Sequence, residues 1–195
     1  KKIADAAMLE NVIRFMFDNI GNPCSTTKIA NTLKSSGHNI SVHTVENYLK
    51  ALCESFVLYK ADRYDIKGKQ YLRSGAKYYV ADIGLRYYLL GQKPADLGHI
   101  LENVVYLELL RRGYEVFVGK SDKSEIDFIA INEEDTEYYQ VALTVRDEKT
   151  LLRELAPLES VNDHNGKYLL TLDDDPPCSH NGIKQVNALD WLLKE

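Results

Sequence analysis

The chain has 195 residues, of which 45% are hydrophobic and 27% are charged, and its formal net charge at pH 7 is -5. This length allows one large core or two small ones, and the absence of any run of about 18 apolar residues argues against a membrane span. The first residues include neither Met nor the apolar run of a signal peptide, and the three cysteines form no CxxC pair. We therefore expect a piece of a longer cytoplasmic protein with reduced thiols.

The two halves of the sequence differ in charge. Residues 1–95 contain 14 Lys and Arg against 8 Asp and Glu, whereas residues 96–195 contain 10 against 21. Such an asymmetry predicts two domains with different partners. We place the first domain at residues 1–75, a connecting helix or linker at 76–95 and the second domain at 96–195.

The first domain begins with three predicted helices and a hairpin. Apolar residues recur at helical spacing in residues 3–20, and Ser25 and Ser41 stand where the N-caps of helices 26–36 and 42–54 are expected. Two strand-like runs, 57–62 and 70–73, then flank a basic turn that contains a glycine.

This order of elements resembles the winged helix-turn-helix family. The resemblance implies that the third helix enters the major groove of DNA while the hairpin tip meets the backbone. The candidate DNA contacts are polar or basic residues of the third helix and the hairpin: His43, Thr44, Asn47, Lys50, Arg63, Lys67 and Lys69. Winged helices also dock proteins, and this third helix has few residues that read bases, so DNA contact and protein docking both stay open.

The connecting segment is rich in aromatic residues. In residues 77–90 (KYYVADIGLRYYLL), Asp82 can cap a short helix. The tyrosines at positions 78, 79, 87 and 88 could stack on bases. The helical spacing of Ile83 and Tyr87 instead favours packing in a core or against the next domain. The run of Gly, Gln, Lys and Pro at 91–94 indicates the domain boundary.

The second domain alternates helices and strands in the order αβββαβ. The predicted elements are a helix at 97–112, strands at 114–118, 125–131 and 138–145, a helix at 147–161, strands at 167–171 and 183–186, and a terminal helix at 188–193. In the helix at 147–161, the leucines at positions 151, 152, 155 and 158 are expected to face inward.

Three polar residues of this domain have the types and order of a metal-dependent nuclease site. Glu102 shares a helix face with apolar residues, and Asp127 lies on the second strand. On the third strand, period-two alternation puts Gln140 and Ala142 on one face. The pattern predicts that Glu102, Asp127 and Gln140 converge in one polar pocket, with Ala142 lining it.

The arrangement resembles the PD-(D/E)xK, or restriction-endonuclease-like, superfamily. The resemblance implies that Glu102 and Asp127 bind Mg²⁺, that Gln140 is the ligand of the third strand, and that a lysine two residues later positions the attacking water. Ala142 occupies that lysine position and supplies no charge. A cation could come instead from Lys120, Lys123 or Arg146, although no spacing favours one of them. We therefore expect a degenerate, non-cleaving core, with a Mg²⁺- or Mn²⁺-dependent DNA nuclease as the alternative.

The chain as a whole resembles the C-terminal region of bacterial and archaeal AAA-type ATPases. The residues that carry this resemblance are the runs 78–86 (YYVADIGLR), 98–109 (GHILENVVYLEL) and 125–128 (EIDF). It implies an N-terminal ATPase module, and ATP would bind only there, since this sequence has no GxxxxGK[ST] motif. The leading hypothesis is a DNA-binding and coupling region of such an ATPase. A further alternative is that both domains dock proteins, including that module, through acidic segments such as 133–135 and 173–175.

Overall fold

The structure is a computed structural model that describes residues 5–92, 96–121 and 124–194, with Arg73 and Ser74 described by their backbone alone. It has a mixed α/β fold. The chain divides into two compact units. The first comprises residues 1–61 and 74–94, and the second comprises residues 62–73 and 95–195.

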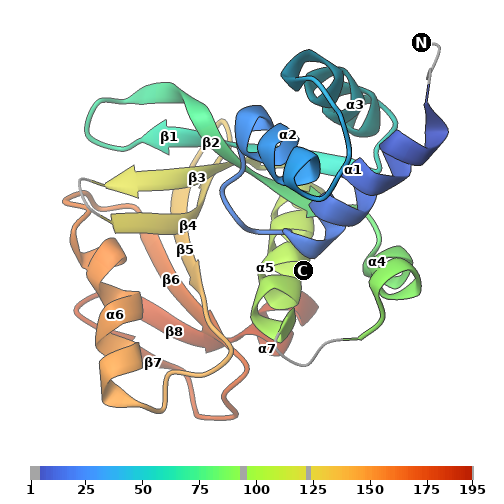
Figure 1. Cartoon of the computed structure of the whole chain (residues 1–195). Helices are drawn as coiled ribbons and strands as arrows, with labels where there is room; N and C mark the ends of the chain where they lie inside the picture. The colour runs from blue at the N-terminus through green and yellow to red at the C-terminus, as the bar shows by residue number, and fades with distance from the viewer. Residues whose placement is uncertain (1–4, 93–95, 122–123, 195) are drawn as a thin grey trace. The chain divides into compact units, whose positions relative to one another are not determined.

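The first unit contains four helices and the inner half of a hairpin (Figure 1). Its elements are α1 (Ala6–Asp18), α2 (Thr26–Ser35), α3 (Val42–Glu54), the start of β1 (Leu58–Asp65), the end of β2 (Gln70–Val80) and α4 (Ile83–Leu90). Hydroxyl oxygens of Ser25 and Ser41 accept backbone N–H bonds at the starts of α2 and α3, and the Asp82 carboxylate does so at α4. All three predicted caps are confirmed.

The core of the first unit is formed by apolar faces of the three helices and by β2. Fully buried positions include Val12, Ile29 and Val45, one on each of α1, α2 and α3. In β2, Tyr78 and Tyr79 are buried, so the packing interpretation is confirmed for these two rings. Tyr88 on α4, in contrast, is 84% exposed.

The outer half of the hairpin belongs to the second unit, which differs from the domain boundary expected at residue 75. Arg63, Tyr64 and Asp65 of β1 pair in parallel with Val118, Gly119 and Lys120 of β3 (Glu115–Ser121). The physical reason is that the backbone N–H and C=O groups at the edge of β3 require partners, and β1 supplies them. The hairpin tip is therefore anchored on this sheet rather than projecting as a separate wing.

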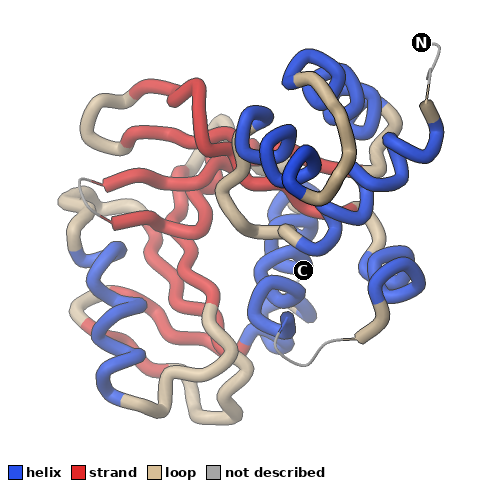
Figure 2. Tube along the Cα trace, in the orientation of Figure 1, coloured by secondary structure: helices blue, strands red, loops and turns tan. Residues whose placement is uncertain are grey.

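The second unit is built around a mixed sheet with the order β2-β1-β3-β4-β5-β6-β8-β7 (Figure 2). The remaining elements are α5 (Leu97–Arg111), β4 (Ser124–Ile131), β5 (Thr136–Val141), α6 (Glu148–Glu159), β6 (Gly166–Thr171), β7 (Cys178–His180), β8 (Ile183–Asn187) and α7 (Ala188–Leu193). Strands β3, β4 and β5 are antiparallel, whereas β5, β6 and β8 are parallel. The short strand β7 was not predicted.

Helices cover both faces of this sheet. Leu155 and Leu158 of α6 pack on a cluster that includes Tyr138 of β5. The next residue of β5, Tyr139, points to the opposite face, where its ring meets Trp191 of α7 at 5.5 Å. On α6, Leu152 is 60% exposed, so the expectation that it faces inward is wrong.

No helix in the described ranges is long and apolar enough to cross a membrane. The three cysteines all lie in these ranges and none is in a disulfide: Cys24 is buried, Cys53 is half-buried and Cys178 is exposed.

Candidate functional site

A polar pocket of about 350 Å³ lies in the second unit, where α5, β4, β5 and α6 meet. Its lining residues are Gly98, His99, Glu102, Asp127, Gln140, Val141, Leu143 and Glu154. The structure thus brings together Glu102 from α5, Asp127 from β4 and Gln140 from β5. It adds a second glutamate, Glu154, from α6.

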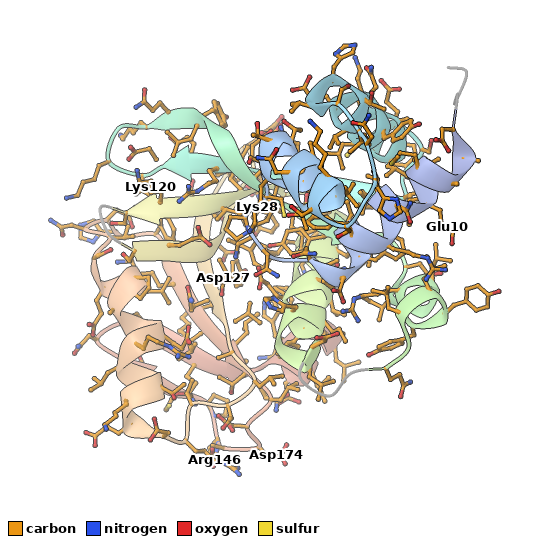
Figure 3. The ribbon with its side chains drawn as sticks, viewed as in Figure 1. Glu10, Lys28, Lys120, Asp127, Arg146 and Asp174 are labelled. Atoms are coloured by element: carbon orange, nitrogen blue, oxygen red, sulfur yellow. The ribbon has the colours of Figure 1, made fainter. Side chains whose placement is uncertain are left out.

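Asp127 lies on β4 (Figure 3), at a point where the regular pairing of this strand is interrupted. The register with β3 shifts between Phe117 and Gly119, and the pairing of β4 with β5 starts only after Asp127, at Phe128 opposite Tyr139. Side chains bridge the gap. The Asp127 N–H donates to Gln140 Oε1 at 3.3 Å, and the Val141 N–H donates to Asp127 Oδ2 at 3.0 Å. Asp127 is therefore held against β5 by its own carboxylate and N–H group.

The interruption also changes which side chains share a face. Strict alternation would put Ile126 and Ile129 on opposite faces of the sheet. Both instead belong to the apolar cluster packed under α6, because the irregularity between them shifts the alternation by one residue.

Gln140 connects the strands to α6. Its Nε2 donates to Glu154 Oε2 at 2.8 Å, and both side chains are buried, at 8% and 9% exposure. The guanidinium of Arg153 donates to the other carboxylate oxygen of Glu154, Oε1, through Nη2 at 2.6 Å and through Nε at 3.1 Å. The buried Glu154 carboxylate thus has hydrogen-bond donors on both oxygens, which offsets the cost of removing it from water.

Glu102 closes the pocket from α5. It is 8% exposed, and His99, one turn earlier on the helix, places Nδ1 3.8 Å from Glu102 Oε2. His99 itself is 44% exposed at the pocket mouth, so a protonated imidazole would form an ion pair with this carboxylate.

Ala142 is not among the residues that line the pocket, whereas Leu143 is. Strand β5 ends at Val141, and Ala142 packs against the apolar cluster under α6 that also contains Tyr138. Because Gln140 reaches Glu154 of α6, residues 138, 140 and 142 share one face as alternation predicts. Ala142 thus shares a face with Gln140 as expected but does not line the pocket.

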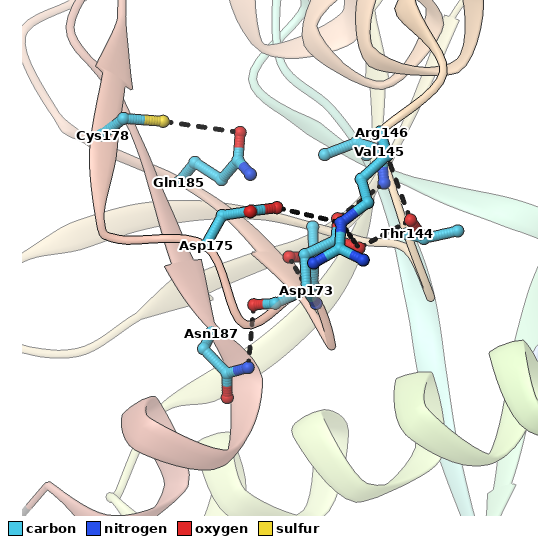
Figure 4. A network of polar contacts seen from close by, with 9 residues as sticks. Thr144, Val145, Arg146, Asp173, Asp175, Cys178, Gln185 and Asn187 are labelled. Atoms are coloured by element: carbon cyan, nitrogen blue, oxygen red, sulfur yellow. Dashed lines mark hydrogen bonds and ion pairs between the residues drawn. The ribbon is translucent and has the colours of Figure 1, made fainter.

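The cations considered from the sequence have other positions. Arg146 follows β5 and makes ion pairs with Asp173 and Asp175, at 3.6 and 3.1 Å (Figure 4). Lys120 lies on β3 opposite Glu125 of β4, and Lys123 is outside the described residues. Arg153 contacts a carboxylate of the pocket, that of Glu154.

Protein donors already contact several carboxylate oxygens of the pocket. The Oδ2 atom of Asp127 and both carboxylate oxygens of Glu154 accept hydrogen bonds. A divalent cation would use such oxygens as ligands. Across the part of the chain that the structure describes, no three Asp, Glu, His or Cys side chains group closely enough to hold a metal ion.

Sequence reasoning missed Glu154, although its spacing contains the signal. Glu154 lies three residues after Leu151 and four before Leu158, on the helix face that packs on the sheet. A charged residue on a buried helix face requires partners, and that requirement alone identifies it as a candidate.

Of the candidate DNA-binding residues of α3, His43, Asn47 and Lys50 are exposed and Thr44 is half-buried. Lys50 lies 3.9 Å from Glu54 and His43 lies 3.9 Å from Glu46, both on the same helix. The Thr44 hydroxyl is 2.8 Å from that of the capping Ser41, and Asn47 is exposed.

The hairpin candidates lie in the second unit. Arg63 makes an ion pair with Glu125 at 3.4 Å. Lys67 and Lys69 line a different pocket of that unit, which lies at the hairpin tip.

Comparisons with known proteins give relatives but no function. Residues 1–96 match the model of a domain of unknown function, DUF8612. An uncharacterized protein of Haemophilus influenzae is 41% identical over 192 residues, which cover 98% of this chain and 47% of that protein. An uncharacterized protein of Methanocaldococcus jannaschii is 32% identical over 137 residues, which cover 68% of this chain and 30% of that protein.

Both relatives are longer than the region that matches this chain. It spans less than half the length of both curated relatives, and no solved structure matches it. The end of the matched domain at residue 96 lies next to the start of the second unit's main segment at residue 95. The chain is thus similar to part of an uncharacterized bacterial protein over nearly its whole length.

Proposed function

We propose that this chain is the DNA-binding and coupling region of an AAA-type ATPase, and that its nuclease-like core does not cleave DNA. The observation that carries the proposal is the hydrogen bonding of Gln140, whose Oε1, the atom that would bind a metal, accepts the Asp127 N–H while its Nε2 donates to Glu154. The order of the elements around this pocket supports its nuclease-like origin.

The chemistry of the pocket supports binding without hydrolysis. Phosphodiester cleavage needs stabilisation of the developing charge on the phosphate, by a metal ion or by cations. Ala142, at the position where a cleavage site has its lysine, packs against the apolar cluster, and Arg153 is paired with Glu154. The pocket thus has carboxylates of a cleavage site, while the position of its lysine holds an uncharged side chain.

The length of the relatives supports the coupling role. The Haemophilus influenzae relative has as much chain outside the matched region as within it, which leaves room for an ATPase module in that protein. In this chain, β1 and β2 each pass from one unit to the other, and the chain passes between the units again at residues 94 and 95. Three covalent connections of this kind support transmission of a binding event between units.

Two assays test this proposal. In the first, supercoiled and single-stranded DNA are incubated with the chain and Mn²⁺, and no cleavage is expected. Cleavage that is lost in Asp127→Ala would contradict the non-cleaving assignment. In the second, fluorescence anisotropy with duplex, branched and single-stranded DNA is measured between about 50 and 200 mM salt, and binding that weakens with salt is expected.

The coupling part requires the longer protein. ATP hydrolysis by the full-length Haemophilus influenzae relative is measured with and without DNA. A rate that DNA changes supports coupling, whereas ATP hydrolysis that is absent in both conditions contradicts the ATPase assignment.

A second candidate function, protein docking, is favoured by α3. The exposed side of this helix carries Glu46 and Glu54 beside Lys50, each within ion-pair distance of a neighbour on the helix. Such a face attracts DNA poorly because its acidic groups repel phosphates. Under this alternative, α3 binds the ATPase module, and Lys50→Glu weakens that association without changing DNA affinity.

A further inference from the structure

A second pocket, with a volume of about 550 Å³, lies in the second unit at the hairpin tip. Its walls come from the end of β1, the hairpin turn, strands β3 to β5 and the segment after α6. Apolar side chains such as Ile66, Ile129 and Val161 line part of it, beside several polar groups. The volume lies within the range of about 300–1,000 Å³ that small-molecule sites occupy.

Two lysines reach this pocket from a turn whose backbone is fixed. The Asp65 carboxylate accepts the N–H groups of Lys67 and Gly68 at 3.1 and 3.0 Å. The Ile66 N–H donates to the Lys120 carbonyl at 3.0 Å. Lys69 has a φ of 46°, a left-handed conformation that a glycine would adopt with less strain. The fold thus places a charged side chain at a position where backbone geometry alone favours glycine.

An exposed aromatic ring, that of Tyr71, contacts the Tyr64 ring that lines the pocket. Tyr64 lines the pocket, and its ring contacts that of Tyr71 edge-on, with centroids 5.4 Å apart. Tyr71 also contacts Phe117 at 5.2 Å, yet it is 63% exposed on the outermost strand, β2. A supported but accessible ring beside cations is the combination on which single-stranded nucleic acids stack their bases.

The charge of the pocket favours an anion. Asp163 is the acidic residue that lines it, and its carboxylate accepts bonds from the Tyr138 hydroxyl at 2.7 Å and from the Asn165 amide at 2.9 Å. The pocket lining therefore contains two lysines and one carboxylate, and this carboxylate already accepts hydrogen bonds from two side chains. The amides of Asn162 and Asn165 add donors and acceptors that match the polar edge of a base.

We propose that this hairpin-tip pocket binds one nucleotide of single-stranded DNA, with the phosphate at Lys67 and Lys69 and the base on the rings of Tyr64 and Tyr71. The inference rests on the proposed DNA-binding function and places the contact at the hairpin tip rather than on α3. It also specifies the substrate as a single strand, because a stacked base must be free of its partner strand.

The test measures anisotropy of a fluorescent oligo-dT of about 12 nucleotides, a length within the usual footprint of single-strand binding domains. Tyr71→Ala should weaken binding about 5-fold or more, whereas Tyr71→Phe, which keeps the ring, should bind like the wild type. Lys67→Gln with Lys69→Gln should weaken binding and reduce the slope of log affinity against log salt by about 0.7, as expected when one phosphate of a single strand is no longer neutralised. Lys149→Gln, at an exposed position of α6, is the matched control and should change neither quantity, while Lys50→Gln tests the contact on α3.

The results distinguish failure of the proposed DNA-binding function from failure of the hairpin-tip site. If the wild-type chain binds no DNA at low salt, both the proposed function and this site fail. If Lys50→Gln weakens binding while the hairpin-tip variants do not, DNA binding stands and this site is rejected. Equal affinity for duplex of the same length, or displacement of the oligonucleotide by poly-glutamate as effectively as by unlabelled oligo-dT, rejects the assignment to a single-strand nucleotide. Thermal unfolding of each variant verifies that the fold is intact.

Discussion

The side-chain amide of Gln140 donates to the carboxylate of Glu154 across 2.8 Å, and both groups are buried. An amide can serve both neighbours here, because its nitrogen donates to Glu154 while its oxygen accepts the Asp127 N–H. A carboxylate at position 140 could accept the Asp127 N–H but could not donate to Glu154. The identity of this residue therefore determines whether the pocket is stable as a closed polar network.

Gln140→Glu should destabilise the chain by about 1–3 kcal/mol at neutral pH, since two buried carboxylates would then face each other. This repulsion raises the pKa of the pair, so the deficit should shrink as pH falls and one proton is taken up. Urea unfolding at about pH 5 and pH 8 measures it. Gln92→Glu, at an exposed position, is the control, and an equal loss in both variants would contradict the prediction.

Ala142→Lys should not create a cleaving site. The side chain at this position packs against the apolar cluster under α6, so an added ammonium is desolvated there rather than placed in the pocket. We expect a loss of about 1–3 kcal/mol relative to Ala142→Met, a change of similar length without charge. Plasmid cleavage in Mn²⁺ and urea unfolding check both statements, and Asp127-dependent cleavage by Ala142→Lys would refute them.

Glu108 should make stability depend on pH in the acid range. Hydrogen bonds from Arg111 lower the pKa of this carboxyl to about 2, with a further contribution from Arg112 and with burial opposing the shift. A lowered folded-state pKa means that the stabilisation is complete above the ordinary value of 4.5 and is lost as pH falls toward 2.

The Glu108→Gln variant tests this linkage. It should cost about 1–3 kcal/mol at pH 7, and the difference from the wild type should diminish between pH 4.5 and 2. Chemical unfolding across this range, with the exposed Glu133→Gln as control, provides the measurement. A difference that stays constant with pH would show that the carboxylate charge is not responsible.

Substitution of Asp173 should destabilise the fold more than substitution of Arg146, although the two residues form one ion pair (Figure 4). Asp173 is buried and accepts the Val145 N–H at 2.8 Å and the Thr144 hydroxyl at 2.6 Å, so Asp173→Ala leaves a buried donor without its acceptor and should cost about 1–3 kcal/mol. Arg146 is 64% exposed, and Arg146→Ala should cost less than about 1 kcal/mol. Comparable losses in the two variants would contradict this assignment.

The sequence predicted correctly the structural features that depend only on residues close together in the chain. Ser25, Ser41 and Asp82 cap helices as expected because a cap needs only the N–H groups two or three residues ahead. The end of β5 at Val141 and the irregularity at Asp127 were not predictable in this way, since both depend on where the pairing of separate strands stops.

The candidate site was predictable in part. Glu102, Asp127 and Gln140 were identified by residue type and order, and they line one pocket. Glu154 was missed because the helix at 147–161 was interpreted through its leucines. The parallel pairing of Tyr64 with Gly119 joins residues distant in sequence, and no local pattern reveals such a contact.

The pairing of β1 with β3 determines how the protein can be divided for study. A fragment cut at the sequence boundary, beginning near residue 96, would lose the hairpin and leave the N–H and C=O groups of β3 at an open edge. Such edges recruit strands from other molecules, so this fragment should aggregate or dimerise at the concentrations used for spectroscopy. A cut that keeps residues 62–73 with the second unit would require a linker in place of residues 74–94, because the end of β2 and α4 lie between the two segments in the sequence. Failure of the isolated second half to stay monomeric would thus reflect a missing strand rather than an intrinsically unstable domain.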